Sequence, residues 1–286
     1  MKLLLFGKNG QIGNFLKNKL NKNKNFFSVS SKECDFLRPE QIEKKIMSIK
    51  PDVIINTAAY TNVRGAEIDK KKAFQINSHA VKTIANCSSI IDARLIHFST
   101  DYVYDGKKSL PYNENDKINP INTYGKSKAN GDQAIILSGC RYVIIRTSWV
   151  FSENNSNFVL NMIDLFKNKK IVEAVVNQTG YPTSAEFLAD CTIKIIKNKT
   201  EFNGVLNITN KGKTNWYEFC KFISKEALKK RLISEKVKIF PKKYVNRNES
   251  LKRPENSCLN SSKFQKLYNY EIKSWKQELI KVMNRL

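Results

Sequence analysis

The stretch KLLLFGKNGQIG, residues 2–13, decides how this chain is expected to fold. Its first half is an apolar run typical of a buried strand, and its second half places Gly7, Gly10 and Gly13 before a segment with helical character. Glycines allow a tight turn and a close backbone approach, while the helix start offers unpaired N–H groups and a partial positive charge. The stretch therefore predicts a pyrophosphate site for a dinucleotide, although the spacing is G-x-x-G-x-x-G rather than G-x-G-x-x-G; a simple glycine turn is the alternative.

Outward from this stretch, short apolar runs alternate with longer amphipathic segments. Strands are expected at residues 2–6, 26–30, 52–57, 94–99, 142–147, 171–176 and 204–209. Helices are expected at 11–21, 39–50, 66–90, 124–138, 156–168, 215–230 and 274–286. The alternation predicts an α/β fold, a Rossmann-like doubly wound parallel sheet with a smaller, closely packed C-terminal α/β region. We expect residues 1–148 and about 184–210 to bind the dinucleotide, and residues 149–183 and 211–286 to bind the substrate.

The composition is that of an ordinary globular protein, with 286 residues, 41% hydrophobic and 27% charged. The net charge of +24 comes from lysines spread along the chain, without zinc-finger spacing or an RNA-binding aromatic motif. It therefore indicates a basic surface rather than a nucleic-acid partner. The six cysteines form no C-x-x-C pair, and no apolar run approaches the ~20 residues that span a bilayer. A cytoplasmic protein with reduced cysteines and no membrane contact is expected.

The second expected strand is followed by SSKECD, residues 30–35, without the acidic residue that usually binds the ribose 2′-hydroxyl. Ser30, Ser31 and Lys32 could instead accept a 2′-phosphate. This pattern predicts NADPH as the cofactor, with NADH as a second option. Asp35 either contacts the adenine end or is simply a loop residue.

The stretch INPINTYGKSKANGD, residues 118–132, places Tyr124 and Lys128 one helical turn apart. A phenol with a cation beside it is a candidate proton donor, and we expect Lys128 to lower the pKa of Tyr124. The same spacing occurs at Tyr104/Lys108 and at Tyr217/Lys221. An Asp-Gly turn follows the first of these pairs, and the second lies in a plain amphipathic helix, so Tyr124 is the stronger candidate.

The fourth expected strand leads into STDYVYDG, residues 99–106, which puts Ser99 and Thr100 at its carboxyl end. A Ser/Thr–Tyr–Lys set with this cofactor loop resembles the extended short-chain dehydrogenase/reductases, and most closely the dTDP-4-dehydrorhamnose reductase family. The resemblance covers nearly the whole chain, through LLLFGKNGQIG, PDVIINTAAYTNV, STDYVYDG, PYNENDKINPINTYGKSKANGD, RTSWVF, NQTGYPTSAEFLAD and RPENSCLN.

The resemblance implies NAD(P)H-dependent reduction of the C4 ketone of a nucleotide-linked 4-keto-6-deoxy sugar, dTDP-4-dehydro-L-rhamnose. It implies the catalytic residues Thr100, Tyr124 and Lys128, with Tyr124 as proton donor, Thr100 on the substrate carbonyl and Lys128 on the nicotinamide ribose. The implied cofactor-binding residues are Gly7, Asn9, Gly10, Gln11, Ile12, Gly13, Ser30, Ser31, Asp35, Phe36, Thr57, Ala58, Ala59, Tyr60, Ser99, Tyr124 and Lys128. The implied substrate-binding residues are Thr100, Asp101, Tyr102, Val103, Trp149 and Arg253.

Several of these positions have a structural alternative. Thr100 could cap a turn, Trp149 could pack in the core, and Arg253 could form a surface salt bridge. Thr183 and Glu186 have the spacing of a helix capping box. His79 and His97 are most simply structural.

The chain also departs from the family pattern, and other functions remain open. Arg64 and Gly65 stand where relatives often have an acid and a base, which leaves the identity of the sugar open. Alternatives are a reductase or epimerase for a different nucleotide-sugar, or a non-catalytic cofactor-binding regulatory subunit. Relatives form dimers, some with Mg²⁺ at the interface, but Asn14 and Phe15 offer no carboxylate. We therefore expect no metal, and a homodimer remains an option.

Overall fold

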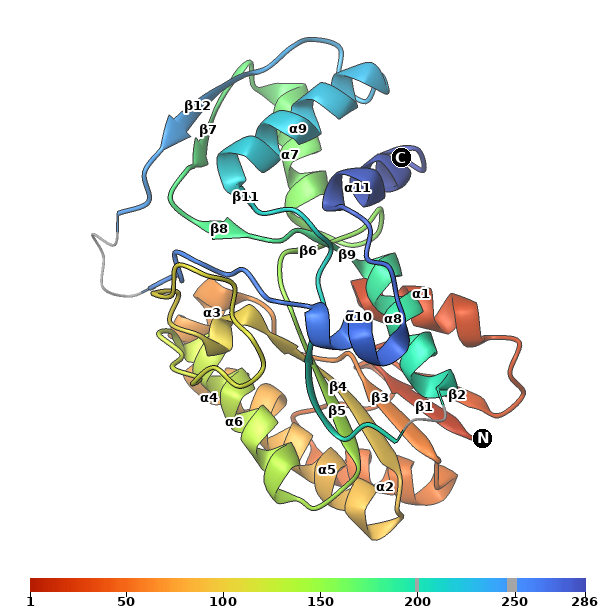
Figure 1. Cartoon of the computed structure of the whole chain (residues 1–286). Coiled ribbons are helices and arrows are strands. Elements are labelled where there is room, and N and C mark those ends of the chain that lie inside the picture. Colours follow the sequence, from red (N-terminus) through yellow and green to blue (C-terminus); the bar gives the residue numbers. More distant parts are fainter. Residues whose placement is uncertain (199–200, 246–250) are drawn as a thin grey trace.

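The computed structural model describes residues 1–198, 201–245 and 251–286. Within these residues the main sheet has six parallel strands in the order β10 (Gly204–Asn207), β5 (Tyr142–Thr147), β4 (Arg94–Thr100), β3 (Val53–Asn56), β1 (Leu3–Phe6) and β2 (Phe26–Val29) (Figure 1). The expected doubly wound parallel sheet is thus confirmed. Its strand order reverses between β1 and β3, and at such a point a crevice opens outside the carboxyl ends of the strands.

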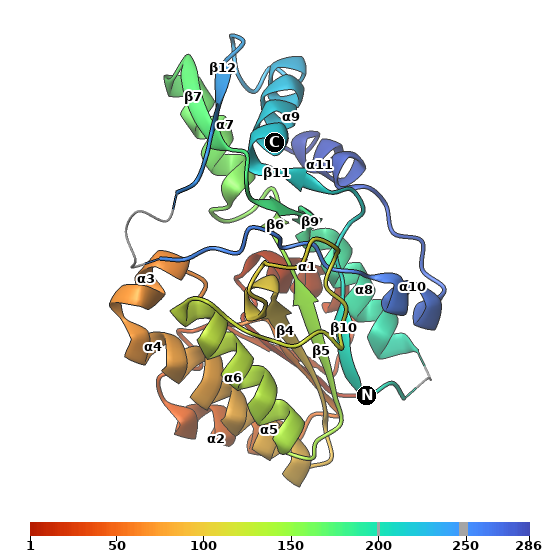
Figure 2. The same cartoon turned by 60° about the vertical axis from the view of Figure 1, so that its left-hand side comes forward.

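Helices cover both faces of the sheet because successive strand side chains point to opposite sides. Leu3 and Leu5 of β1 face one core, whereas Leu4 and Phe6 face the other. The first core is covered by α1 (Gln11–Leu20), α8 (Ala185–Lys197) and α10 (Ser262–Tyr268), and the second by α2 (Pro39–Ile49), α5 (Ala80–Ile90) and α6 (Thr123–Leu137) (Figure 2).

A smaller lobe sits above the carboxyl ends of the strands (Figure 1). It contains α7 (Phe158–Asn168), α9 (Trp216–Lys229), α11 (Trp275–Met283) and the parallel pair β7 (Ile171–Val175) and β12 (Lys238–Lys242). The expected strand at 171–176 therefore lies outside the main sheet, with Val172 and Ala174 buried in the lobe and Ile171 exposed. Two short pairs join the lobes, β6 (Val150–Phe151) with β9 (Thr183–Ser184) and β8 (Thr179–Gly180) with β11 (Thr214–Asn215). Helix α10 packs on the main sheet, although it falls in the range 211–286.

The prediction of a single helix at residues 66–90 is wrong. The segment forms α3 (Val63–Ile68), α4 (Lys70–Phe74), a π-helical turn η1 (Gln75–His79) and α5. The break occurs at Asp69, which leaves the helical conformation (φ −113°, ψ 71°) and caps α4 by accepting from the Lys72 N–H. The π turn buries Asn77, whose side chain donates to the Tyr60 carbonyl and to the Ser127 hydroxyl, each at 3.0 Å. The turn thus ties the loop after β3 to α6.

The capping box expected at Thr183 and Glu186 is also wrong. The N-cap of α8 is Ser184, whose hydroxyl accepts from the Phe187 N–H at 3.4 Å. Glu186 points elsewhere and accepts from Arg285 of the terminal segment at 2.6 Å. The Glu186 carboxylate therefore forms a long-range ion pair with Arg285 and does not cap the helix, as its local spacing had predicted it would.

All six cysteines are free and buried. In the described part of the chain, no helix is long and apolar enough to cross a membrane. The described residues also contain no group of three or more His, Cys, Asp or Glu side chains placed to hold a metal ion.

A buried ion pair links β4, β5 and α6. Asp132 accepts from the Ser99 hydroxyl at 2.8 Å and from the Arg146 guanidinium at 3.4 Å. The Asp132 and Arg146 side chains are only 1% and 4% exposed. Arg146 also donates to the Tyr104 hydroxyl at 2.9 Å, so its charge is neutralised and hydrogen-bonded inside the protein.

Replacing Asp132 with Asn should leave the Arg146 charge buried without a counter-ion. We expect a loss of about 3–5 kcal/mol in the free energy of unfolding, measured by urea denaturation. The matched control is Asp164→Asn, which breaks the exposed pair with Lys167 and should cost less than about 1 kcal/mol. Equal losses in the two variants would contradict this account of the buried pair.

Candidate active site

A cavity of about 450 Å³ lies at the switch point of the sheet. The predicted cofactor residues that line it are Gly7, Asn9, Gly10, Gln11, Ile12, Ser30, Ser31, Asp35, Phe36, Thr57, Ala58 and Ala59. They come from the ends of β1, β2 and β3 and from the start of α1, which the chain brings together only through the parallel pairing.

The glycine loop has the shape that a pyrophosphate needs. Gly7 has φ +86°, and a Cβ at Gly13 would collide with the Gly7 carbonyl, so this turn requires glycine at both positions. Gly10 is the N-cap of α1 and has no side chain to occupy the first-turn N–H groups, and no acidic residue lies in that turn. The loop therefore presents unpaired donors and a positive helix end, which suits the diphosphate of a dinucleotide.

The cavity also has a wall that the sequence did not predict. Val150, Asn155 and Ser156 line it from the segment after β5, and the Asn155 amide donates to the Asn9 carbonyl at 2.9 Å. Ser152 of the same segment donates to the Gln11 side chain at 2.9 Å. No local motif marks these residues, because their role depends on contacts between segments 146 and 141 positions apart in the sequence.

The Ser30 hydroxyl, which was predicted to bind a 2′-phosphate, already has another hydrogen-bond acceptor in the structure. The Ser30 hydroxyl and N–H both donate to Glu33, at 2.7 and 2.8 Å, and the Lys8 ammonium lies 2.6 Å from the same carboxylate. These partners lower the pKa of Glu33 to about 2, with the Lys8 hydrogen bond as the largest cause. Lys32 is exposed and is not among the cavity-lining residues. The sequence shows that Glu33 is a carboxylate just past the second strand. It does not show that Ser30 and Lys8 are its partners.

Thr100 ends β4 and begins a short 3-10 helix, η2 (Asp101–Val103). Its hydroxyl accepts from the Tyr102 N–H at 3.2 Å and donates to Asp101 at 3.0 Å, so the expected alternative of a turn cap is observed. The Thr100 side chain also lies close enough to the Tyr124 hydroxyl to lower its pKa. The Tyr102 and Tyr124 rings meet edge to face with centroids 5.7 Å apart. The structure therefore brings Thr100 and Tyr124 together.

The start of α6 is held against η2 by its capping contacts. The Asn122 side chain accepts from the Gly125 N–H at 2.8 Å, and Glu67 of α3 accepts from the Thr123 N–H at 2.7 Å. A Cβ at Gly125 would collide with the Tyr102 carbonyl, so the glycine permits the close approach. This packing fixes the position of Tyr124 in the first turn of α6.

The expectation that Lys128 lowers the pKa of Tyr124 is wrong in this structure. Burial raises the pKa of Tyr124 above its ordinary value, and the nearby Thr100 hydroxyl only partly opposes this effect. Lys128 is itself buried, and its Nζ atom donates to the Phe98 carbonyl at 2.6 Å and lies 3.1 Å from Nε2 of His97. Burial lowers the pKa of Lys128 to about 8.

The other predicted substrate residues surround η2 and the lobe boundary. Asp101 is buried, and burial raises its pKa to about 6 although the nearby Ser257 and the hydrogen bond from Thr100 both act to lower it. Arg253 donates to the Tyr102 hydroxyl at 3.2 Å. Trp149 has φ +47° and stacks on Trp216, with ring centroids 3.5 Å apart. Trp149 thus packs against the smaller lobe, as its structural alternative predicted.

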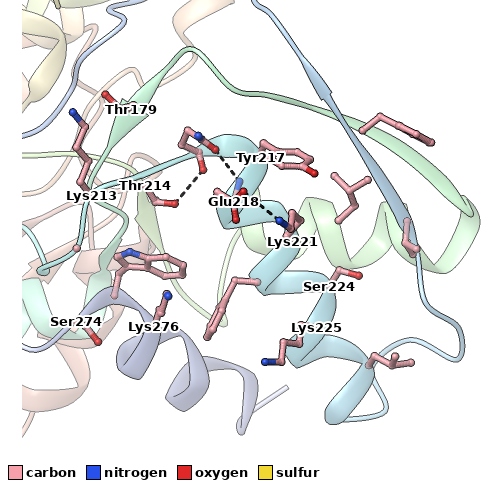
Figure 3. Close-up of a pocket in the computed structure, with 18 of the residues that line it drawn as sticks. Thr179, Lys213, Thr214, Tyr217, Glu218, Lys221, Ser224, Lys225, Ser274 and Lys276 are labelled. Carbon is pink, nitrogen blue, oxygen red and sulfur yellow. Dashed lines mark hydrogen bonds and ion pairs between the residues drawn. The ribbon is translucent and has the colours of Figure 1, made fainter.

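A second cavity, of about 1450 Å³, lies in the smaller lobe between α9, β12 and the start of α11 (Figure 3). Lysines surround it, among them Lys213, Lys221, Lys225 and Lys276, while Trp275 and Phe222 provide apolar surface. Lys221 pairs with Glu218 at 3.2 Å. The residues that line this cavity do not include Thr100, Tyr124 or Lys128.

Fold and site together define a reductase-type dinucleotide enzyme of the short-chain dehydrogenase/reductase class. The family described as "RmlD substrate binding domain" matches residues 1–286. A dTDP-4-dehydrorhamnose reductase of Escherichia coli K12 is 35% identical over 293 aligned positions, covering 100% of this chain and 98% of the relative.

Solved structures agree with this match. A dTDP-4-dehydrorhamnose reductase from Clostridium acetobutylicum is 31% identical with a TM-score of 0.91, covering 100% of this chain and 99% of that one. A dTDP-4-dehydrorhamnose reductase from Bacillus anthracis, in complex with NADP, is 30% identical with a TM-score of 0.92 over 100% of both chains. The chain belongs to the RmlD substrate binding domain family and is an NAD(P)H-dependent oxidoreductase.

Replacing Glu33 with Gln should favour NADPH over NADH. A 2′-phosphate carries more negative charge than a hydroxyl, so removing the carboxylate beside Ser30 should help NADPH more, by about three- to tenfold in the ratio of dissociation constants. Fluorescence titration with both cofactors measures this ratio. The control is Glu40→Gln on α2, an exposed residue outside the cavity lining. An unchanged ratio in Glu33→Gln would show that this carboxylate does not act on the cofactor site.

Proposed function

We propose that this chain uses NADPH to reduce the C4 ketone of a nucleotide-linked 4-keto-6-deoxy sugar, converting dTDP-4-dehydro-L-rhamnose to dTDP-L-rhamnose. The observation that carries the proposal is that Tyr124 lies beside η2 at the carboxyl end of β4, close enough to Thr100 for that side chain to lower its pKa. This strand is the neighbour of β3, whose end contributes Thr57, Ala58 and Ala59 to the dinucleotide cavity. The name of the E. coli relative is that of an enzyme of this reaction.

The cofactor supplies a hydride to the ketone carbon, and the protein must supply a proton to the oxygen. Tyr124 is the proton donor in this proposal. Its raised pKa keeps the phenol protonated at neutral pH, which is the form a donor needs. Thr100 orients the carbonyl by hydrogen bonding, and Lys128, one turn further along α6, holds the nicotinamide ribose.

The remaining substrate contacts are proposed on the same edge. Asp101, Tyr102 and Val103 of η2 line the sugar position, with Trp149 on the other side. Arg253 is the proposed partner of the diphosphate, because its guanidinium lies next to Tyr102 and offers a planar fork for phosphate oxygens. In this scheme residues 149–183 and 211–286 bind the substrate, and residues 1–148 and about 184–210 bind the cofactor.

Asp101 and Tyr102 support reduction rather than dehydration. Dehydratases of this fold have an Asp-Glu pair after the threonine, which supplies the acid and the base for the elimination of water. Here tyrosine follows Asp101, and its ring packs on Tyr124. The elimination would lack its base.

The Tyr124→Phe variant should lose turnover by about a hundredfold or more, because general acid catalysis commonly contributes 10²–10⁴-fold. The assay follows loss of NADPH absorbance with enzymatically generated dTDP-4-dehydro-L-rhamnose, and NADPH binding is measured separately. Tyr217→Phe is the matched control, since Tyr217 has the same spacing to Lys221, whose ammonium lies 4.9 Å from its ring. Near-normal turnover of Tyr124→Phe would remove this residue from the mechanism.

A further inference from the structure

A short polar loop, residues 152–157, leads from β6 to α7 along the rim of the dinucleotide cavity. Asn155 lines the cavity, and its amide donates to the Asn9 carbonyl of the glycine loop at 2.9 Å. The Ser152 hydroxyl contacts the Gln11 side chain, at the start of α1, at 2.9 Å. The position of this loop therefore determines whether the cavity is closed on the side of the smaller lobe.

Hydrogen bonds within the loop make it a stiff unit. The Asn157 amide donates to the Ser152 carbonyl at 2.9 Å and to the Asn155 carbonyl at 3.0 Å. Its Oδ1 atom accepts from the Val159 N–H in the first turn of α7 at 3.0 Å. Asn155 has φ +63°, a conformation that persists only where the surrounding contacts fix it. A change at one residue of the loop is therefore expected to move the others.

Glu153 of this loop is a nearly buried carboxylate with one partner. Its side chain is 14% exposed, and Oε1 accepts from the Arg285 guanidinium at 2.9 Å. Its Oε2 atom is buried and has no hydrogen-bond partner within the part of the chain that the structure describes. Among the described residues, Arg285 alone forms an ion pair with this carboxylate. The charge of Glu153 thus depends on a side chain 132 positions away in the sequence.

Arg285 also connects the loop to the main lobe. The same guanidinium donates to Glu186 of α8 at 2.6 Å. Glu186 has a second cation nearby, because the Lys19 ammonium of α1 lies 3.7 Å from its carboxylate. If the guanidinium were removed, Glu186 would keep a positively charged neighbour and Glu153 would have none among the described residues.

We infer that Arg285 is a positioning residue, which pairs with Glu153 and thereby keeps loop 152–157 closed on the dinucleotide cavity. Without the guanidinium, a nearly buried carboxylate would be unpaired, and this state is unfavourable until the loop opens and water reaches the charge. Opening breaks the contacts of the loop with Asn9 and Gln11. Cofactor binding must then close the loop again, which lowers the apparent affinity. The inference rests on the proposed function in one respect, that NADPH binds in this cavity.

The Arg285→Gln variant should bind NADPH about tenfold more weakly, the scale of one buried polar group left without a partner. Fluorescence titration gives the dissociation constant, and stopped-flow displacement by NADP⁺ should show that faster release accounts for most of the change. Thermal unfolding without cofactor verifies that each variant is folded. An unchanged dissociation constant would overturn the inference alone. Failure of the unmodified chain to bind NADPH would contradict the proposed function and the inference with it.

A second substitution separates this role from a general structural one. Adding Glu153→Gln to Arg285→Gln removes the unpaired carboxylate and should restore the dissociation constant to within about twofold of that of the unmodified chain. The matched control adds Glu186→Gln to Arg285→Gln, which should restore nothing, because Glu186 still has Lys19 beside it. Equally weak binding in both double variants would mean that Arg285 acts on the fold in general, and would overturn the inference.

Hydrogen exchange of the ligand-free chain reports the opening of the loop directly. In Arg285→Gln the backbone amides of residues 152–157 should exchange faster than in the unmodified chain, while those of the β7–β12 pair should keep their rates. Weaker NADPH binding without faster exchange in the loop would mean that the Glu153 charge acts on the cofactor through space. That result would overturn the positioning role of Arg285.

Discussion

The strand order reverses between β1 and β3, because the connection after β1 crosses one face of the sheet and the connection after β3 crosses the other. The rest of the structure depends on this reversal. Helix α1, which follows β1, covers one face of the sheet, and α5, which follows β3, covers the other, so the carboxyl ends of the strands stay accessible between them. Gly7 and Gly13 then allow the loop after β1 to pack tightly enough for α1 to point its N-terminus into the crevice. One sheet edge thereby collects the cofactor loop, Thr57 to Ala59, and the end of β4.

Polar and charged side chains lie buried beneath this edge of the sheet. Asp132 and Arg146 form a buried ion pair, while facing nitrogen atoms of Asn56, His97 and Lys128 lie 3.1 Å apart in a row. Low exposure strengthens each of these contacts and penalises any that is missing. The same burial shifts the pKa of Tyr124 upward and that of Lys128 downward, which brings both toward their uncharged forms.

The smaller lobe is joined to the sheet by pairings of only two residues per strand, and by aromatic stacking. Trp149 leaves the end of β5 with a positive φ and lies flat on Trp216 of α9. A Cβ at Gly180 would collide with the Trp149 ring, so β8 also follows this contact closely. The indole therefore couples the position of the lobe to the strand that carries Arg146.

The sequence by itself determined the sheet, the glycine loop and the Tyr124–Lys128 spacing, because these depend on short-range periodicity and on residue types with narrow conformational preferences. Only the tertiary structure decided what depends on partners far along the chain. Glu33 interacts with Lys8 and Ser30, and Glu186 pairs with Arg285 instead of capping α8. The strand expected at 171–176 pairs with β12 outside the main sheet. The pKa shifts of Tyr124 and Lys128 also depend on the tertiary structure, since desolvation is a property of the packed neighbours and not of the spacing between two residues.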